Sequence, residues 1–325
     1  MNTHTRVFES AVAVREKVPL LLGLMGPSGS GKTYSALRLA TGIQSVSGGE
    51  IFVIDTEAKR AKHYADKFKF QHTPFGAPFS PTDYLAAIQH CMAKGAGVIV
   101  VDSMSHEHEG QGGVLEMHEA ELDRMTGKDG EAWKRNANNF PAWAKPKAER
   151  RKLISALLQM NCNFIFCFRA KEKAKPVKKD GKSSLENQGW MPIAGEEFIF
   201  EQTANMLLLP SSNGVPTWRS EYPGERSMMK LPEQFRGILD REDAQLTEDI
   251  GAQLAEWAKG APPRIANPAT LELARTAARG GTDVFEVWWK TASKDERADA
   301  KTIKDELASL RTDADAEQAA KEDMP

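Results

Sequence analysis

The feature that most constrains this 325-residue chain is a glycine-rich segment that follows an apolar run. The segment Gly26-Pro-Ser-Gly-Ser-Gly-Lys32-Thr33 matches the pattern G-x-x-x-x-G-K-[ST] at every fixed position. The preceding run, residues 20–25, predicts a buried strand, because strands covered on both faces need no polar alternation. The helix formers that follow predict a helix beginning at Lys32. A flexible Gly/Ser loop would need neither this spacing nor the flanking strand and helix, so the pattern indicates a phosphate-binding loop.

Each position of this loop has a residue type that phosphate binding requires. Glycines let the backbone curl so that its N–H groups point at an anion, and the helix N-terminus adds partial positive charge. Lys32 supplies a point charge for the β- and γ-phosphates, and the Thr33 hydroxyl suits Mg²⁺. We therefore predict that ATP and Mg²⁺ bind here. The predicted nucleotide-binding residues are Gly26, Pro27, Ser28, Gly29, Ser30, Gly31, Lys32 and Thr33.

Acidic residues follow two further apolar runs. Residues 51–54 lead to Asp55 and Glu57, and residues 98–101 lead to Asp102. Alternating strands and helices predict an α/β fold, a mostly parallel sheet flanked by helices, with ligands at the carboxyl ends of the strands. Asp102 at that edge would hold Mg²⁺ together with Thr33. The alternative for Asp102 is a helix cap, which is common after strands.

The three motifs, residues 26–33, 54–57 and 98–103, resemble the nucleotide-site motifs of RecA/RadA recombinases in order and spacing. In AAA+ and helicase-type ATPases a glutamate usually follows the Walker B aspartate, whereas Ser103 follows Asp102 here. In the RecA family the glutamate at the position of Glu57 polarises the attacking water. The resemblance covers residues 18–240 and implies a RecA-like P-loop ATPase core in which Glu57 and Lys32 are catalytic.

Two other segments resemble the RecA-like ATPases of tailed bacteriophages more closely, some of which serve in single-strand annealing recombination. These segments are residues 103–119 and 166–173. The closer resemblance implies a role in phage recombination or replication, with a homo-oligomeric ring or filament and phage proteins of those processes as partners.

A strongly basic segment follows the predicted strand 163–168. Arg169 at its end is placed to sense the γ-phosphate, and the alternative is a surface charge. Residues 169–182 contain seven Lys and Arg but only two acidic residues, and this composition predicts a mobile basic loop. In the RecA family a DNA-binding loop leaves the core at this place, and the alternative is a solvated charge run. The predicted single-stranded DNA-binding residues are Lys171, Lys173, Lys175, Lys178, Lys179 and Lys182.

The segment 103–150 allows more than one interpretation. His106, His108 and His118 lie among glutamates but lack the spacing H-E-x-x-H, so a polar rim near the γ-phosphate or a partner loop is favoured over a metal site. Aromatic residues alternate with lysine and arginine between residues 133 and 147. They predict either a stacking surface for single strands or anchors that pack a loop onto the core.

Composition limits the class of protein. Hydrophobic content of 41%, charged content of 27% and a net charge of -2 are those of a soluble globular protein, so any DNA contact must come from local patches. Cys91, Cys162 and Cys167 lack C-x-x-C spacing and indicate buried thiols in a reducing compartment. No apolar run reaches the ~18 residues of a membrane span. We therefore predict a cytoplasmic protein, in an infected or lysogenic bacterial host, with no membrane contact.

Composition shifts also predict the domains. A lead-in over residues 1–17 precedes an ATPase core over 18–260, a Pro-rich linker over 261–268 and a small helical domain with an acidic tail over 269–325. The function predicted for the whole chain is Mg-dependent ATP hydrolysis with single-stranded DNA binding. Two alternatives remain: a nucleotide or small-molecule kinase, which should show an arginine-rich lid, and a scaffold or loader whose hydrolysis times release of a partner protein.

Overall fold

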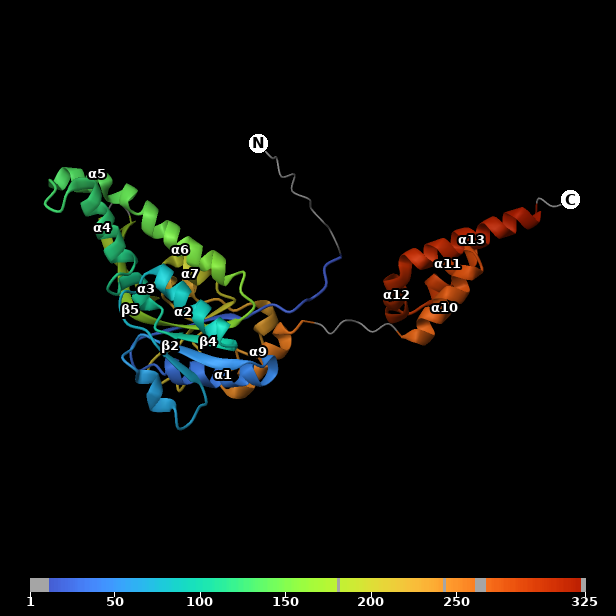
Figure 1. The fold of residues 1–325 in the computed structure, drawn as a ribbon, viewed down its shortest axis with the longest axis horizontal. Helices are drawn as coiled ribbons and strands as arrows, with labels where there is room; N and C mark the ends of the chain where they lie inside the picture. The colour runs from blue at the N-terminus through green and yellow to red at the C-terminus, as the bar shows by residue number, and fades with distance from the viewer. Residues whose placement is uncertain (1–11, 180–181, 242–243, 261–266, 323–325) are drawn as a thin grey trace. The chain divides into compact units, whose positions relative to one another are not determined.

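A computed structural model describes residues 12–179, 182–241, 244–260 and 267–322 (Figure 1). The chain divides into two units, Met1–Gly260 and Ala261–Pro325. A seven-stranded sheet in the first unit has the order β3-β2-β4-β5-β1-β7, with β6 paired to β5. All pairs are parallel except β5–β6, which confirms the predicted mostly parallel α/β sheet. The strands are β1 (Leu21–Gly26), β2 (Glu50–Asp55), β3 (Gln71–Pro74), β4 (Ala96–Asp102), β5 (Asn163–Lys179), β6 (Lys182–Pro192) and β7 (Ala204–Leu207).

Helices cover both faces of this sheet. The central strands are apolar on both sides, so alternate residues enter two separate cores: Leu22 and Leu24 face one, and Leu21 and Met25 face the other. The first core is closed by α1 and α9, and the second by α2, α6 and α7 (Figure 1). These helices are α1 (Lys32–Ser47), α2 (Pro81–Ala93), α6 (Ala144–Leu157), α7 (Glu196–Phe200) and α9 (Glu248–Ala258). The double cover explains why β1 needs no polar alternation.

The remaining elements of the first unit are short or lie outside these two layers. After β4 the chain forms α3, then the neighbouring helices α4 and α5, before α6 returns to the sheet (Figure 1). These elements are η1 (Arg60–Tyr64), α3 (Ser105–Glu109), α4 (Val114–Thr126), α5 (Ala132–Ala142), α8 (Pro223–Met228) and η2 (Glu233–Phe235).

The prediction of a mobile loop over residues 169–182 is wrong for those of its residues that the structure describes. β5 continues beyond the sheet and pairs antiparallel with β6 from Ala170–Pro192 to Lys179–Lys182. Cross-strand backbone hydrogen bonds therefore order a segment that its charge made resemble a solvated loop. The basic segment is one strand of a β-hairpin, here called the basic hairpin (β5 from Ala170 and β6).

The second unit is built from helices alone among its described residues. Its small core contains Phe285 and Leu307 with several alanines, and Trp288 and Trp289 pack against it. Its helices are α10 (Pro268–Arg279), α11 (Thr282–Thr291), α12 (Lys294–Ala300), η3 (Lys301–Ile303) and α13 (Lys304–Glu322). Residues 1–11 of the predicted lead-in and 261–266 of the predicted linker lie outside the described residues. Within the described part of the chain, no helix is both long and apolar enough to cross a membrane.

Candidate nucleotide-binding site

The glycine-rich loop joins β1 to α1 at the carboxyl edge of the sheet. Gly29 and Gly31 have φ values of 79° and 84°, a left-handed backbone that glycine adopts without a Cβ penalty. Gly31 directly precedes α1, so the free N–H groups of the first helical turn face the loop. Lys32 Nζ donates to the carbonyl oxygens of Gly26 at 2.9 Å and Pro27 at 2.8 Å. The lysine therefore lies inside the loop, where a phosphate can replace carbonyl oxygens as its partner.

Burial lowers the pKa of Lys32. Lys32 is only 9% exposed, and burial lowers its pKa while the carboxylates of Asp102 and Glu57 oppose the shift. An anionic ligand would supply a charge partner for this buried ammonium. The loop amides, the helix N-terminus and Lys32 together fit a polyphosphate.

Thr33 and Asp102 meet across the edge of the sheet. Thr33 Oγ1 donates to Asp102 Oδ2 at 2.5 Å, although 69 residues separate them. Burial raises the pKa of Asp102 to about 6, and the Thr33 hydrogen bond opposes that rise. A hydroxyl and a carboxylate are hard oxygen ligands of the kind Mg²⁺ takes, and a cation would offset the burial of this carboxylate. The pair fits a magnesium site beside the phosphate-binding loop.

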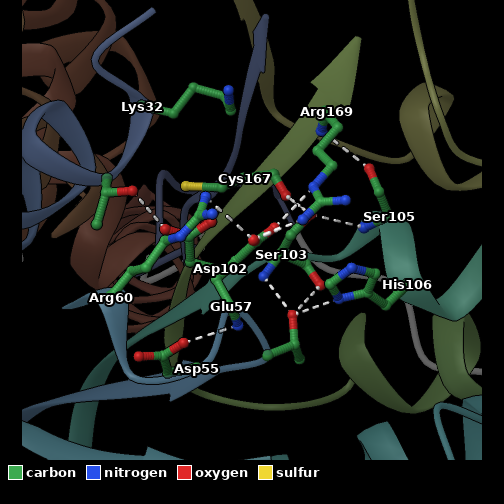
Figure 2. Close-up of polar contacts among 12 residues, drawn as sticks. Lys32, Asp55, Glu57, Arg60, Asp102, Ser103, Ser105, His106, Cys167 and Arg169 are labelled. Atoms are coloured by element: carbon green, nitrogen blue, oxygen red, sulfur yellow. Dashed lines mark hydrogen bonds and ion pairs between the residues drawn. The ribbon is translucent and has the colours of Figure 1, made fainter. Parts of the chain in front are cut away.

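Glu57 and Arg169 form a bidentate ion pair in the same pocket. Arg169 Nε donates to Glu57 Oε1 at 2.7 Å and Nη2 to Oε2 at 2.5 Å, and Figure 2 shows the two side chains pointing at each other. The hydrogen bonds to Glu57 raise the pKa of Arg169. The parallel register sets Arg169 beside Gly26, because β5 lies between β1 and β4. Arg60 Nη1 also lies 3.6 Å from Glu57 Oε2.

A cavity of about 640 Å³ joins these groups. It is lined by the phosphate loop and by Glu57, Asp102 and Arg169, so the structure brings the predicted catalytic and metal-binding side chains to one place. Glu109 also lines this cavity and was not predicted as a site residue. It belongs to the histidine- and glutamate-rich segment, and no spacing rule separates it from its neighbours.

A second cavity of about 290 Å³ also borders the loop and shares Gly29 and Gly31 with the first. It is lined by Tyr34 and Arg38 of α1 and by Gln245. Tyr34 packs edge-on against Phe68, with ring centroids 5.4 Å apart. Two cavities that meet at one phosphate loop fit a nucleoside and its phosphates. Sequence reasoning missed this second cavity, because residues about 200 positions away complete it.

The lysines of the basic hairpin that the structure describes lie mostly in solvent. Lys171, Lys173, Lys175 and Lys178 lie along β5, and most of this strand beyond Ala170 is exposed. Lys171 Nζ lies 3.4 Å from Glu109 Oε2, which connects the base of the hairpin to the cavity. Lys179 and Lys182 form the last pair of the ladder between β5 and β6.

The histidine- and glutamate-rich segment serves the fold at three points. Glu107 and Arg150 form a buried ion pair with two hydrogen bonds of 2.9 Å. His106 Nδ1 lies 2.7 Å from Thr56 Oγ1, one residue before Glu57 (Figure 2). The His118 ring stacks on Trp143 with centroids 4.2 Å apart. Among the residues that the structure describes, no group of three or more His, Cys, Asp or Glu could hold a metal ion.

The aromatic residues of segment 133–147 differ in exposure, and only Trp143 has the contact that the anchor interpretation predicts. Trp143 is an anchor within the fold, because it stacks on His118. Trp133 and Phe140 of α5 are 64% and 82% exposed. All three cysteines are free and buried, as their spacing predicted.

The fold and the site together define a nucleotide-binding domain of the P-loop class. A family model described as AAA domain (AAA_24) matches residues 19–202, which include β1, the phosphate loop, Glu57, Asp102 and Arg169. The chain belongs to this family of AAA domains, and that membership indicates a nucleotide-binding protein with NTPase activity. No curated protein matches the chain.

Proposed function

We propose that this protein is a Mg-dependent ATPase of the RecA-like type that binds single-stranded DNA. The observation that carries the proposal is the ion pair between Glu57 and Arg169. It connects a carboxylate that lines the phosphate-loop cavity to the strand that continues as the basic hairpin. Occupancy of the hairpin and reactivity at the phosphate can therefore influence each other through one side chain.

The chemistry follows from the groups around the larger cavity. Lys32 and the loop amides would bind the β- and γ-phosphates, and Thr33 and Asp102 would hold Mg²⁺, which neutralises charge on the phosphate oxygens. Glu57 would accept a proton from the water that attacks the γ-phosphorus. The bond from the γ-phosphorus to the bridging oxygen breaks, and ADP and phosphate leave.

Arg169 has two competing partners in this scheme. While the ion pair holds, both carboxylate oxygens of Glu57 accept hydrogen bonds from Arg169, so the guanidinium competes with water for them. The γ-phosphate of a bound nucleotide offers Arg169 another anion. We propose that Arg169 moves from Glu57 to the γ-phosphate, and that DNA on the basic hairpin favours this exchange.

DNA would bind the basic hairpin mainly through its phosphates. The described lysines of β5 lie on a paired strand at the surface, so they can follow a backbone without the cost of ordering a loop. The wider setting we propose is phage recombination or replication in the cytoplasm of a bacterial host, with a homo-oligomer as the active form. The proposed ATPase core is 18–260, with the helical domain 269–325 as an appendage.

A triple variant of the hairpin tests the DNA site. Replacing Lys173, Lys175 and Lys178 by Ala should weaken binding of a labelled single-stranded oligonucleotide and flatten its salt dependence, whose slope is about -0.7 per phosphate neutralised. ATP hydrolysis without DNA should survive, because none of the three lines the nucleotide cavity.

The matched control is a triple Lys-to-Ala variant on other elements, at Lys94, Lys152 and Lys259. It changes the net charge equally and should retain DNA binding. If both variants bind DNA with the wild-type affinity and salt slope, the DNA site lies elsewhere. The exposed side chains of Trp133 and Phe140 would then be the next candidates for the DNA site. If the wild type binds no single strand, with or without ATP, the kinase or loader function is favoured.

A further inference from the structure

The helical second unit contains a cavity that nucleotide binding does not use. It has a volume of about 470 Å³ and lies between α11, η3 and the first half of α13. Its apolar floor includes Phe285, Trp289 and Leu307. The core of this unit is small and rich in alanine, so it does not cover all of the aromatic side chains. The aromatic surface left in the cavity is apolar, and a ligand could cover it.

Cations surround this floor. The cavity is lined by four basic residues and one acidic residue, which are Lys290, Lys301, Lys304, Arg311 and Glu286. Arg311 is fixed in place, since its guanidinium lies 4.6 Å from the centre of the Phe285 ring and donates to the Leu307 carbonyl oxygen at 3.2 Å. Lys301 and Lys304 are exposed, and no ion pair to either is found among the described residues. Two lysine ammonium groups therefore remain available to a ligand at the rim.

The charge of the cavity is opposite to that of the unit around it. Residues 261–325 contain ten Lys and Arg against thirteen Asp and Glu. A long polyanion such as a nucleic acid strand carries charge at every residue and would extend past the cavity over this acidic surface. A short segment that carries its negative charge only beside the cavity avoids that repulsion.

We propose that this cavity binds a short acidic segment of a partner protein, with an apolar side chain on the Phe285–Trp289 floor and carboxylates beside Lys301 and Lys304. Aromatic and aliphatic contact would supply most of the affinity, and the charge pairs at the exposed rim would select acidic segments and speed association. This site is separate from the nucleotide chemistry, so the second unit would recruit a partner.

Fluorescence anisotropy with the full chain tests the proposal. The probe is a fluorescein-labelled pentapeptide, Asp-Asp-Asp-Leu-Phe, and the comparison probes are Lys-Lys-Lys-Leu-Phe and a labelled oligothymidylate. Of the two peptides, only the acidic one should bind saturably; oligothymidylate should bind the basic hairpin, and equally well in the wild type and in the cavity variant below. Lys301→Glu/Lys304→Glu should weaken it about tenfold or more, because two rim attractions become repulsions. Both lysines are exposed, so the double variant should fold, which circular dichroism checks.

The matched control is Lys94→Glu/Arg279→Glu, which makes the same charge change outside the cavity and should leave peptide binding within about twofold. Equal weakening in both double variants would overturn the proposal, since the attraction would then be non-specific. No saturable peptide binding at millimolar concentration would also overturn it. Oligothymidylate binding that only the cavity variant loses would assign the cavity to nucleic acid instead. The peptide outcomes depend neither on ATP hydrolysis nor on the basic hairpin, so they can fail independently of the proposed function.

Discussion

Replacing Glu57 by Gln separates nucleotide binding from hydrolysis. The amide cannot accept a proton from water, so turnover should fall by ~10²-fold or more, the scale for removing a positioned base. ATP affinity should remain, because Lys32, Thr33 and the loop amides hold the phosphates and Glu57 contacts none of these groups. The expected variant therefore binds ATP and fails to cleave it.

The structure limits how much of that loss could come from unfolding. The Glu57 side chain is 11% exposed and that of Arg169 is 41% exposed, so water screens the ion pair and its net contribution is about 1 kcal/mol. The glutamine side chain of the variant would keep one carbonyl acceptor for Arg169, which reduces the cost further. A loss of turnover of about 10²-fold corresponds to about 2.7 kcal/mol in the activation free energy. The increase in activation free energy should thus be larger than the decrease in the free energy of unfolding.

Three measurements on the same variant check this prediction: phosphate release under saturating ATP, binding of a fluorescent ATP analogue, and urea denaturation. Glu109→Gln is the matched control, because Glu109 also lines the cavity but pairs with Lys171 instead of Arg169. It should change turnover by no more than about threefold. If Glu109→Gln abolishes turnover and Glu57→Gln does not, the assignment of the water-activating carboxylate is wrong.

Three further predictions concern named side chains. Lys32→Ala should abolish ATP binding or turnover, and near wild-type phosphate release would contradict the site. Arg150→Met leaves Glu107 buried without its ion partner and should lower the free energy of unfolding by about 3 kcal/mol in urea, with partial recovery on adding Glu107→Gln. Burial, reinforced by the charge of Arg150, lowers the pKa of His108 to about 4. Below the usual histidine pKa of about 6.5, the unfolded chain therefore binds more protons than the folded chain, and the free energy of unfolding should fall by about 1–2 kcal/mol as the pH drops toward 4. The fall should be smaller in His108→Gln. Equal pH dependence of stability in the two proteins would refute this prediction.

Local patterns were enough to predict the sheet and the phosphate loop. The apolar runs and the fixed glycine spacing depend on residues next to one another, so they are visible in one dimension. α1 begins at Lys32 as predicted, and the parallel sheet follows from the alternation of strands and helices. Because parallel strands end at one edge, Asp102 could be placed beside Thr33 from the sequence alone.

Contacts between distant residues could not be predicted in the same way. The pairing of β5 with β6 depends on cross-strand hydrogen bonds, which the charge of the segment does not reveal. The ion pair between Glu57 and Arg169 joins residues 112 positions apart and depends on β5 entering between β1 and β4. The acidic residue Glu107 resembled a candidate metal ligand, and only the contact between α3 and α6 shows it paired with Arg150.

The most direct test of the central claim is the rate of ATP hydrolysis by the full chain with Mg²⁺, measured with and without single-stranded DNA. We expect basal phosphate release that Glu57→Gln lacks, and a higher rate when DNA is present. The increase should disappear when Lys173, Lys175 and Lys178 are replaced by Ala, while the basal rate remains. A wild-type rate that DNA leaves unchanged, under conditions where the DNA is bound, would contradict coupling through Arg169, and the absence of any hydrolysis would contradict the ATPase itself.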